Sequence, residues 1–122
     1  LRSLAWLLMT TGVSADIGHA GVHMPWLEDF EATFEGLPIE KVSTYLADRC
    51  GAVATAMYFV MAEKRGSDLK EFRGSTANDM LSARVPSLVN QPPPEAYLRY
   101  AVDFMEWCAE NTPKWDPVSF DS

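Results

Sequence analysis

Strand-like runs alternate with helix-like runs from residue 41 onward, and this alternation restricts the fold more than any other feature. The β-branched and aromatic runs "KVSTYLA" (41–47) and "RGSTA" (73–77) are typical of strands, and "KWDPVSFDS" (114–122) is expected to return to a strand. Between them, "CGAVATAMYFVMAEKRG" (50–66) and "PEAYLRYAVDFMEWCAEN" (94–111) have helical spacing. The order predicts an α/β protein with a parallel sheet and helices outside it, as in a barrel or an open doubly wound sheet.

Three further segments are predicted to be helical. They are "LRSLAWLLMTTG" (1–12), "PWLEDFEATFEG" (25–36) and "NDMLSAR" (78–84). Pro86 and the run "NQPPP" (90–94) are expected to interrupt regular structure, because proline lacks the amide proton that helices and sheets use.

Charge and composition exclude several functional classes. The 122 residues suit one modest domain, and the net charge of −7 with a sequence pI near 4.7 argues against nucleic-acid binding. The apolar stretch "SLAWLLMTTGVSA" is too short to span a bilayer, so no membrane partner is expected. Cys50 and Cys108 are far apart and lack CxxC spacing, so we expect buried thiols and a cytoplasmic protein.

Motifs that would identify an active site by themselves are missing from the sequence. It contains no GxGxxG, P-loop, HExxH or GxSxG pattern. His19 and His23 have the spacing of metal ligands on one helix face, but "IGHAGVHMP" contains two glycines and a proline and is a poor helix. The sequence therefore does not favour a metal site.

Hydroxyl-bearing residues occur in all three predicted strands. Strands of a sealed core are usually near-continuous Val, Ile and Leu, whereas "VSTYL", "RGSTA" and "PVSFDS" each carry Ser or Thr. Hydroxyls that face inward would leave room for something polar in a barrel. The alternative, that these are half-exposed strand positions, fits the pattern equally well.

Several blocks of the sequence, taken in order, resemble one enzyme family. "DIGHAGV", "LEDFEATFEGLPIEKVSTYL", "GAVATAMYFVMAEKRG", "RGSTANDML", "NQPPP" and "NTPKWDPVSFDS" resemble successive blocks of the catalytic barrel of the methylmalonyl-CoA mutase family, which are adenosylcobalamin-dependent acyl-CoA mutases. The resemblance covers residues 16–122 and leaves 1–15 as an unmatched N-terminal helix. It implies a segment of a (β/α)8 TIM-type barrel with about three parallel strands and flanking helices. In such a barrel the pantetheine arm of an acyl-CoA would lie along the axis, with cobalamin across the mouth.

The resemblance also implies roles for individual residues, none of them a catalytic acid, base or nucleophile. Ala77 stands where the family has Gln, and Ser87 where it has an Arg that binds a free carboxylate of the substrate. Serine cannot make that bidentate contact, so methylmalonyl-CoA is disfavoured and a neutral or bulkier acyl group is expected. The positions implied to bind the acyl-CoA are Ser43, Tyr45, Ser75, Ala77, Asn78, Asp79 and Ser87, and those implied to lie near the cofactor are Ala20 and Pro86.

Two hypotheses about function follow. In the first, the chain is part of the catalytic domain of an adenosylcobalamin-dependent acyl-CoA mutase, a carbon-skeleton isomerase with a radical mechanism. It would be completed by the remaining mutase domains or by a cobalamin-binding subunit, and would be inactive alone. In the second, the chain is a truncated, non-catalytic mutase-like module that acts in binding or oligomeric assembly, with self-association covering its strand edges.

Overall fold

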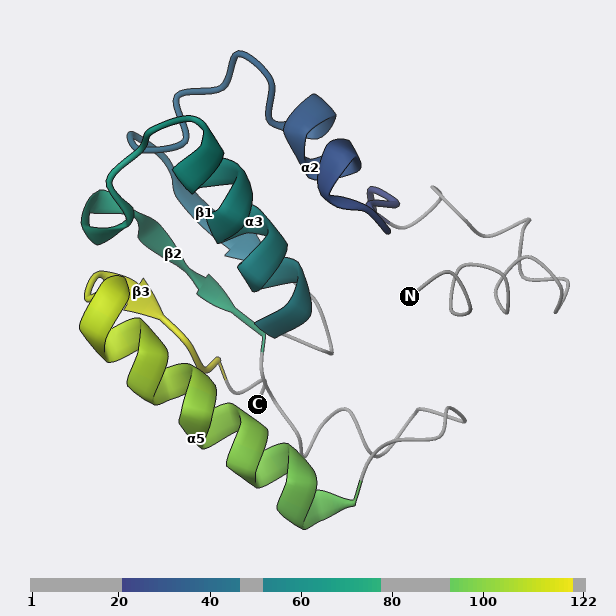
Figure 1. The fold of residues 1–122 in the computed structure, drawn as a ribbon, viewed down its shortest axis with the longest axis vertical. Coiled ribbons are helices and arrows are strands. Elements are labelled where there is room, and N and C mark those ends of the chain that lie inside the picture. The colour runs from purple at the N-terminus through teal and green to yellow at the C-terminus, as the bar shows by residue number, and fades with distance from the viewer. Residues whose placement is uncertain (1–20, 47–51, 78–92, 120–122) are drawn as a thin grey trace, which may run out of the picture. The chain divides into compact units, whose positions relative to one another are not determined.

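The computed structural model describes residues 21–46, 52–77 and 93–119, and the chain forms two compact units, residues 1–35 and 36–122. The first unit contains helix α2 (Leu27–Thr33). Asp29 in the first turn of α2 accepts a hydrogen bond from the backbone N–H of Trp26 (3.0 Å). The elements of the second unit are shown in Figure 1 and are β1 (Ser43–Leu46), α3 (Ala52–Lys64), the 3-10 helix η2 (Leu69–Glu71), β2 (Arg73–Thr76), α5 (Pro94–Asn111) and β3 (Trp115–Asp116).

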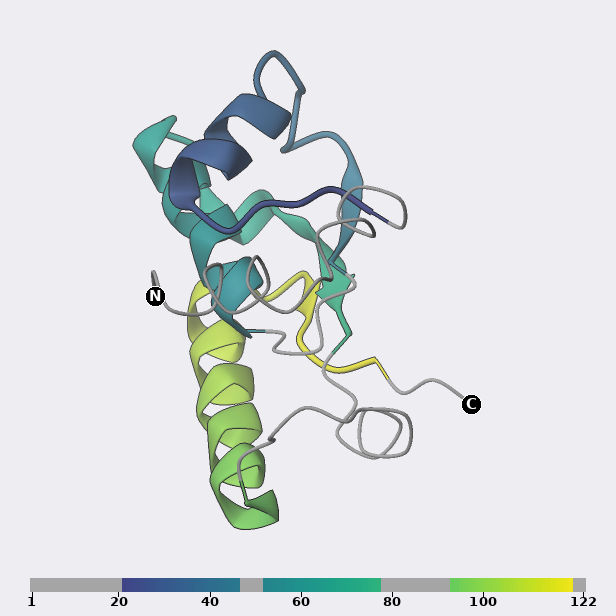
Figure 2. The ribbon, with the colours of Figure 1, turned by 90° about the vertical axis from the view of Figure 1, so that its right-hand side faces the viewer.

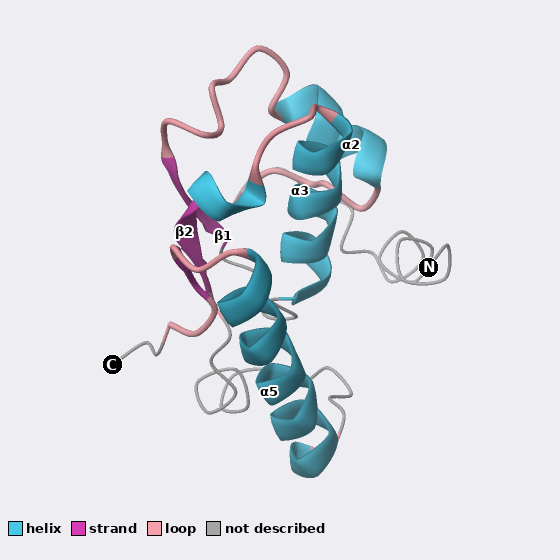
Figure 3. Cartoon of the chain, turned by 60° about the vertical axis from the view of Figure 1, so that its left-hand side comes forward, coloured by secondary structure: helices cyan, strands magenta, loops and turns pink. Residues whose placement is uncertain are grey.

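The three strands form one parallel sheet in the order β1-β2-β3. Its register pairs Tyr45 with Ser75 and Ser75 with Asp116. Figure 3 shows α3 and α5 on the same side of β1 and β2, and Figure 2 shows α5 to one side of the yellow strand β3. The predicted parallel sheet with outer helices is confirmed for this unit.

Local sequence explains where two of these elements end. Helix α3 ends in a Schellman motif: Gly66 has φ 75°, its N–H bonds to the carbonyl of Glu63 (2.9 Å), and the Ser67 N–H bonds to that of Ala62 (3.1 Å). Strand β3 stops at Asp116 because Pro117 has no N–H to continue the ladder. The predicted strand over 114–122 is therefore shorter than expected within the described residues.

Aromatic rings fill the space between the sheet and its two helices. Phe59 of α3 contacts Trp115 of β3 edge to face, with ring centroids 5.0 Å apart, and stacks on Trp107 of α5 at 5.6 Å. Tyr58 meets Phe72 at 5.8 Å. Such pairs are worth about 0.5–1.5 kcal/mol each beyond the area they bury, so this cluster holds both helices on the sheet.

This unit is an α/β fragment consistent with part of a TIM-type barrel. In such a barrel the helices form the outer ring, and the sheet face that carries no helices lines the interior. The predicted helices at 1–12 and 78–84 lie outside the described residues. No helix in the described ranges has the length and apolar character needed to cross a bilayer.

Candidate functional site

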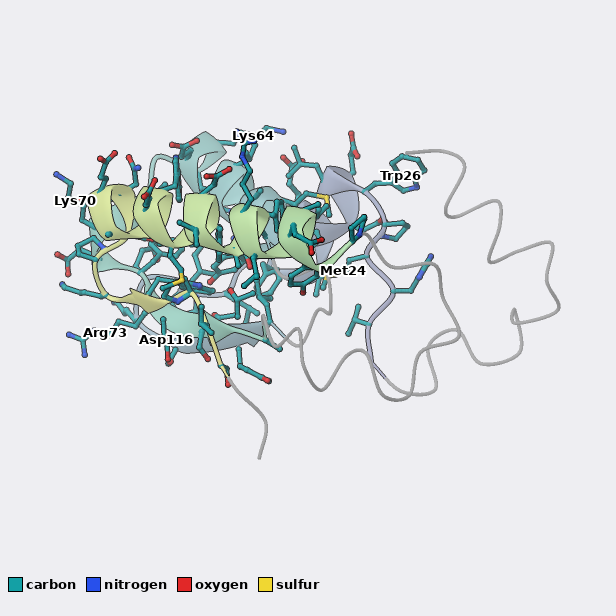
Figure 4. The ribbon with its side chains drawn as sticks, turned by 90° about the horizontal axis from the view of Figure 1, so that it is seen from below. Met24, Trp26, Lys64, Lys70, Arg73 and Asp116 are labelled. Atoms are coloured by element: carbon teal, nitrogen blue, oxygen red, sulfur yellow. The ribbon has the colours of Figure 1, made fainter. Side chains whose placement is uncertain are left out.

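The sheet has two faces of different character. Side chains alternate along a strand, and residues paired in register point to the same side. The helix-covered face carries Thr44, Leu46, Gly74, Thr76 and Trp115. The opposite face, which we call the open face, carries Ser43, Tyr45, Arg73, Ser75 and Asp116. Figure 4 shows Arg73 and Asp116 on the side of the strands away from α5.

Hydroxyls on the helix-covered face are used within the core. The fully buried Thr76 hydroxyl lies 2.8 Å from the Thr55 hydroxyl of α3 and accepts a hydrogen bond from the indole N–H of Trp115 (2.9 Å). The Thr44 hydroxyl lies 2.9 Å from the hydroxyl of Tyr58. Buried polar groups need such partners, and these hydrogen bonds fix α3 and β3 against the sheet.

Gly74 lies where atoms of β1 and β3 leave no room for a side chain on β2. A Cβ atom at this position would lie 2.1 Å from the carbonyl oxygen of Thr44 and 2.5 Å from the ring of Trp115. Only a residue without a side chain allows the indole to lie across β2, and this indole is the one that reaches Thr76.

Two ionisable groups behind the sheet have perturbed pKa values. Burial raises the pKa of Tyr58, although the Thr44 hydrogen bond acts in the opposite direction. Burial also raises the pKa of the Cys108 thiol, which disfavours the thiolate form that a nucleophile needs. The prediction of a buried thiol is confirmed for Cys108, and Cys50 lies outside the described residues.

A third perturbed group lies away from this core. The hydroxyl of Ser67 donates a hydrogen bond to the carboxylate of Glu40 and lowers its pKa. This contact is exposed, and so is the 2.6 Å ion pair between Lys114, just before β3, and Glu71 of η2. Exposed pairs of this kind contribute little to stability.

The open face brings together three of the residues that the sequence singled out. Tyr45 and Ser75 are paired in register, and Ser43 lies two residues before Tyr45 on the same strand. Ser43 is exposed, Tyr45 is 52% exposed and Ser75 is half-buried. Because neighbouring strands are about 4.8 Å apart, Tyr45 and Ser75 start side by side on the open face, and we call this pair of hydroxyl-bearing residues the polar strip.

The other predicted site residues are placed only in part. Ala77 follows β2 directly, is half-buried, and donates its N–H to the carbonyl of Leu46 (3.0 Å), so the ladder extends through it. The predicted positions that lie outside the described residues are Asn78, Asp79, Ser87, Ala20 and Pro86.

Sequence reasoning missed the two charged residues of the open face. Arg73 starts β2, and Asp116 is the register partner of Ser75. The Val118 N–H donates to Asp116 Oδ1 (3.3 Å). Among the described residues, Arg73 and Asp116 form no ion pair with each other. The register of β3 decides on which face of the sheet Asp116 lies. A strand of two residues is too short for its sequence to predict that register.

The described residues contain no metal centre. Within the described ranges, no three His, Cys, Asp or Glu side chains gather closely enough to hold a metal ion. His23 is exposed, and His19 lies outside the described residues. Ala20 and Pro86, the two positions that the sequence resemblance assigned to the cobalamin side, also lie outside the described residues.

Comparison with known proteins gives this face a family context. The family model for methylmalonyl-CoA mutase matches residues 10–122. The chain is 31% identical over 109 residues to the methylmalonyl-CoA mutase of Escherichia coli strain K12, which covers 88% of this chain and 15% of that relative. It is also 31% identical over 109 residues to the mitochondrial methylmalonyl-CoA mutase of Homo sapiens, covering 88% of this chain and 14% of the relative.

A relative with a different name is nearly as similar. The ethylmalonyl-CoA mutase of Methylorubrum extorquens is 28% identical over 105 residues, which is 85% of this chain and 15% of the relative. The chain thus spans about 15% of the length of the curated relatives it matches. Because the family model matches nearly the whole chain, the chain belongs to the methylmalonyl-CoA mutase family.

Proposed function

We propose that the open face is part of the inner wall of the catalytic barrel of an adenosylcobalamin-dependent acyl-CoA mutase, where it lines the path of the acyl-CoA. The observation that carries the proposal is that Ser43, Tyr45 and Ser75 share one face of the sheet, whereas α3 and α5 lie on the other side of the strands (Figure 3). In a (β/α)8 barrel that face points to the axis.

The wall would act by positioning the substrate. The pantetheine arm of CoA contains amides and a hydroxyl, and the hydroxyls of Ser43, Tyr45 and Ser75 can both donate to and accept from such groups. Their backbone is held from behind by the hydrogen bonds of Thr44 and Thr76. A rigid backing keeps the ligand-facing side chains in one geometry, which limits the entropy lost on binding.

The described residues contribute orientation and shielding. Adenosylcobalamin, when bound by the complete enzyme, supplies the radical that starts a carbon-skeleton rearrangement. The hydroxyl wall keeps the acyl-CoA aligned and limits contact with water, and none of its hydroxyls has to act as an acid or base. In this proposal the remaining mutase domains complete the barrel, and either they or a separate cobalamin-binding subunit bring the cofactor, in a cytoplasmic setting.

Substrate selection is proposed to differ from that of a methylmalonyl-CoA mutase. Ala77 has no polar group to present at the end of β2, and Ser87 lacks the guanidinium that would pair with a free carboxylate. An acyl group that is neutral or bulkier is therefore the proposed substrate class. The reaction class remains isomerisation by a mutase.

Photo-crosslinking of the intact protein tests the proposal. A photoreactive acyl-CoA, activated on the protein and mapped by mass spectrometry, is expected to label peptides that contain 43–46 and 73–77. Excess CoA should suppress the labelling. The substitution Ser75→Trp should abolish it by filling the polar strip. A matched bulky substitution, Val53→Trp at a 45% exposed site on α3, should not.

The outcomes are separable. Labelling confined to α3 and α5, or equal loss in both Trp variants, would contradict an acyl-CoA path on the open face. A circular dichroism spectrum of each variant shows whether lost labelling reflects lost structure.

A second candidate function, assembly without catalysis, is favoured by exposed apolar side chains on the outer helices. Leu98, Val102 and Met105 lie at i, i+4 and i+7 on α5 and are all exposed. Such a stripe is typical of a surface that another protein element covers. Light scattering distinguishes the two functions: a stable oligomer that binds neither CoA nor adenosylcobalamin, and that Val102→Glu dissociates, would favour assembly.

A further inference from the structure

Asp116 is the only acidic residue among the described strand residues of the open face. From this placement we infer that Asp116 is a specificity-determining residue that disfavours acyl groups with a free carboxylate. The inference rests on the proposed function and adds to it a residue that the family resemblance did not supply.

The register places Asp116 beside the acyl end of the proposed path. Asp116 pairs with Ser75 on the neighbouring strand, about 4.8 Å away. Ala77, at the end of the same β2 ladder, lies two residues further along, which is about 6.6 Å. A ligand whose acyl group reaches Ala77 therefore passes the neighbouring set of register partners, Ser75 and Asp116.

The Asp116 side chain is held in place on this face. Its neighbour Trp115 is 4% exposed and is anchored on the helix-covered face by the hydrogen bond to Thr76. Strand alternation then directs Asp116 to the open face. The Val118 N–H donates to Oδ1 (3.3 Å), a contact that favours one orientation of the carboxylate on this face.

Charge decides which ligands this carboxylate accepts. Inside an enclosed barrel, two carboxylates a few ångströms apart repel with little screening by salt. A neutral acyl group meets no such repulsion, so the carboxylate of Asp116 does not weaken its binding. Arg73 offsets part of the repulsion, but it lies two residues before Ser75, farther from Ala77.

Competitive binding to the intact protein tests the inference. The probes are butyryl-CoA, whose acyl group is neutral, and succinyl-CoA, whose acyl group ends in a carboxylate, each displacing a fluorescent CoA ester. The wild type should prefer butyryl-CoA. Asp116→Asn should strengthen succinyl-CoA binding about tenfold and leave butyryl-CoA unchanged. The matched control Asp103→Asn, on the exposed side of α5, should change neither affinity.

A second variant of opposite sign separates charge from folding. Arg73→Gln removes the cation of the same face, so it should lower the affinity for succinyl-CoA relative to butyryl-CoA. If the wild type binds both esters, and Asp116→Asn and Arg73→Gln leave the ratio of the two affinities unchanged, the role of Asp116 is overturned while the proposed path stands. Failure of the wild type to bind either ester would overturn the proposed function and the inference together.

Discussion

The two faces of the sheet use hydroxyl groups in opposite ways. On the helix-covered face, Thr44 and Thr76 are bonded to Tyr58, Thr55 and Trp115, and Thr76 is fully buried. On the open face, Ser43 and Tyr45 are exposed and Ser75 is half-buried. Hydroxyls in a strand therefore indicate a binding surface only where the core does not already use them.

The largest expected effect comes from filling the space at Gly74. Gly74→Ala places a Cβ atom 2.1 Å from the Thr44 carbonyl and 2.5 Å from the Trp115 ring, so β1 or β3 must move. The substitution should lower the free energy of unfolding by about 3 kcal/mol. Urea unfolding followed by tryptophan fluorescence measures it.

Gly66→Ala provides the control for this substitution. A Cβ atom at Gly66 would meet nothing within 4 Å, and its cost comes only from φ 75°, about 1 kcal/mol. Equal costs at the two glycines would show that the three strands are not packed as closely as the structure has them.

The next effect is expected from Thr76→Val. The change keeps the shape of the side chain but removes the hydroxyl that accepts from the Trp115 indole and contacts Thr55. A buried donor that loses its partner costs about 2 kcal/mol, and the same urea experiment reports it. Thr76→Ser, which keeps the hydroxyl, is the comparison; a larger loss for Ser than for Val would mean that the methyl group matters more than the hydrogen bonds.

A smaller effect is expected at Tyr58, and it depends on pH. Tyr58→Phe removes the contact with Thr44 and should cost about 1 kcal/mol at neutral pH. Burial raises the folded-state pKa of Tyr58 above its unfolded value of about 10, so the wild type loses stability as pH rises past 10. The difference in stability between wild type and variant should therefore be constant below about pH 10 and narrow as the pH rises above it.

Urea unfolding at each pH measures this difference. The Cys108 pKa is also raised, so Cys108 contributes its own alkaline loss to both proteins, and the comparison between them cancels it. A constant gap across the pH range would show that Tyr58 is not buried in the folded protein.

Much of this fold follows from local pattern. Helix α5 covers Pro94–Asn111, the range that helical spacing predicts, and β1 and β2 lie within the predicted strands. The sequence could not show which hydroxyls lie on the helix-covered face and which on the open face. Ser43 and Thr44 are adjacent, and only the register decides which of them meets Tyr58. Asp116 was missed for the same reason: its position beside Ser75 is a long-range pairing.

The smallest effect on stability is expected from a substitution on the open face, Ser75→Ala. Ser75→Ala removes a half-buried hydroxyl that has no role in the packing of α3 or α5, so the free energy of unfolding should change by less than about 0.5 kcal/mol. Affinity of the intact protein for an acyl-CoA, measured by displacement of a fluorescent CoA ester, should fall about fivefold, the value of one hydrogen bond to a ligand. Thr76→Val, one residue away, should have the opposite effect. It should lower the free energy of unfolding, while the molecules that stay folded keep most of their affinity for the acyl-CoA. A Ser75 variant that loses stability but keeps its affinity would place the working hydroxyls on the helix-covered face and remove the basis for an acyl-CoA path along the sheet.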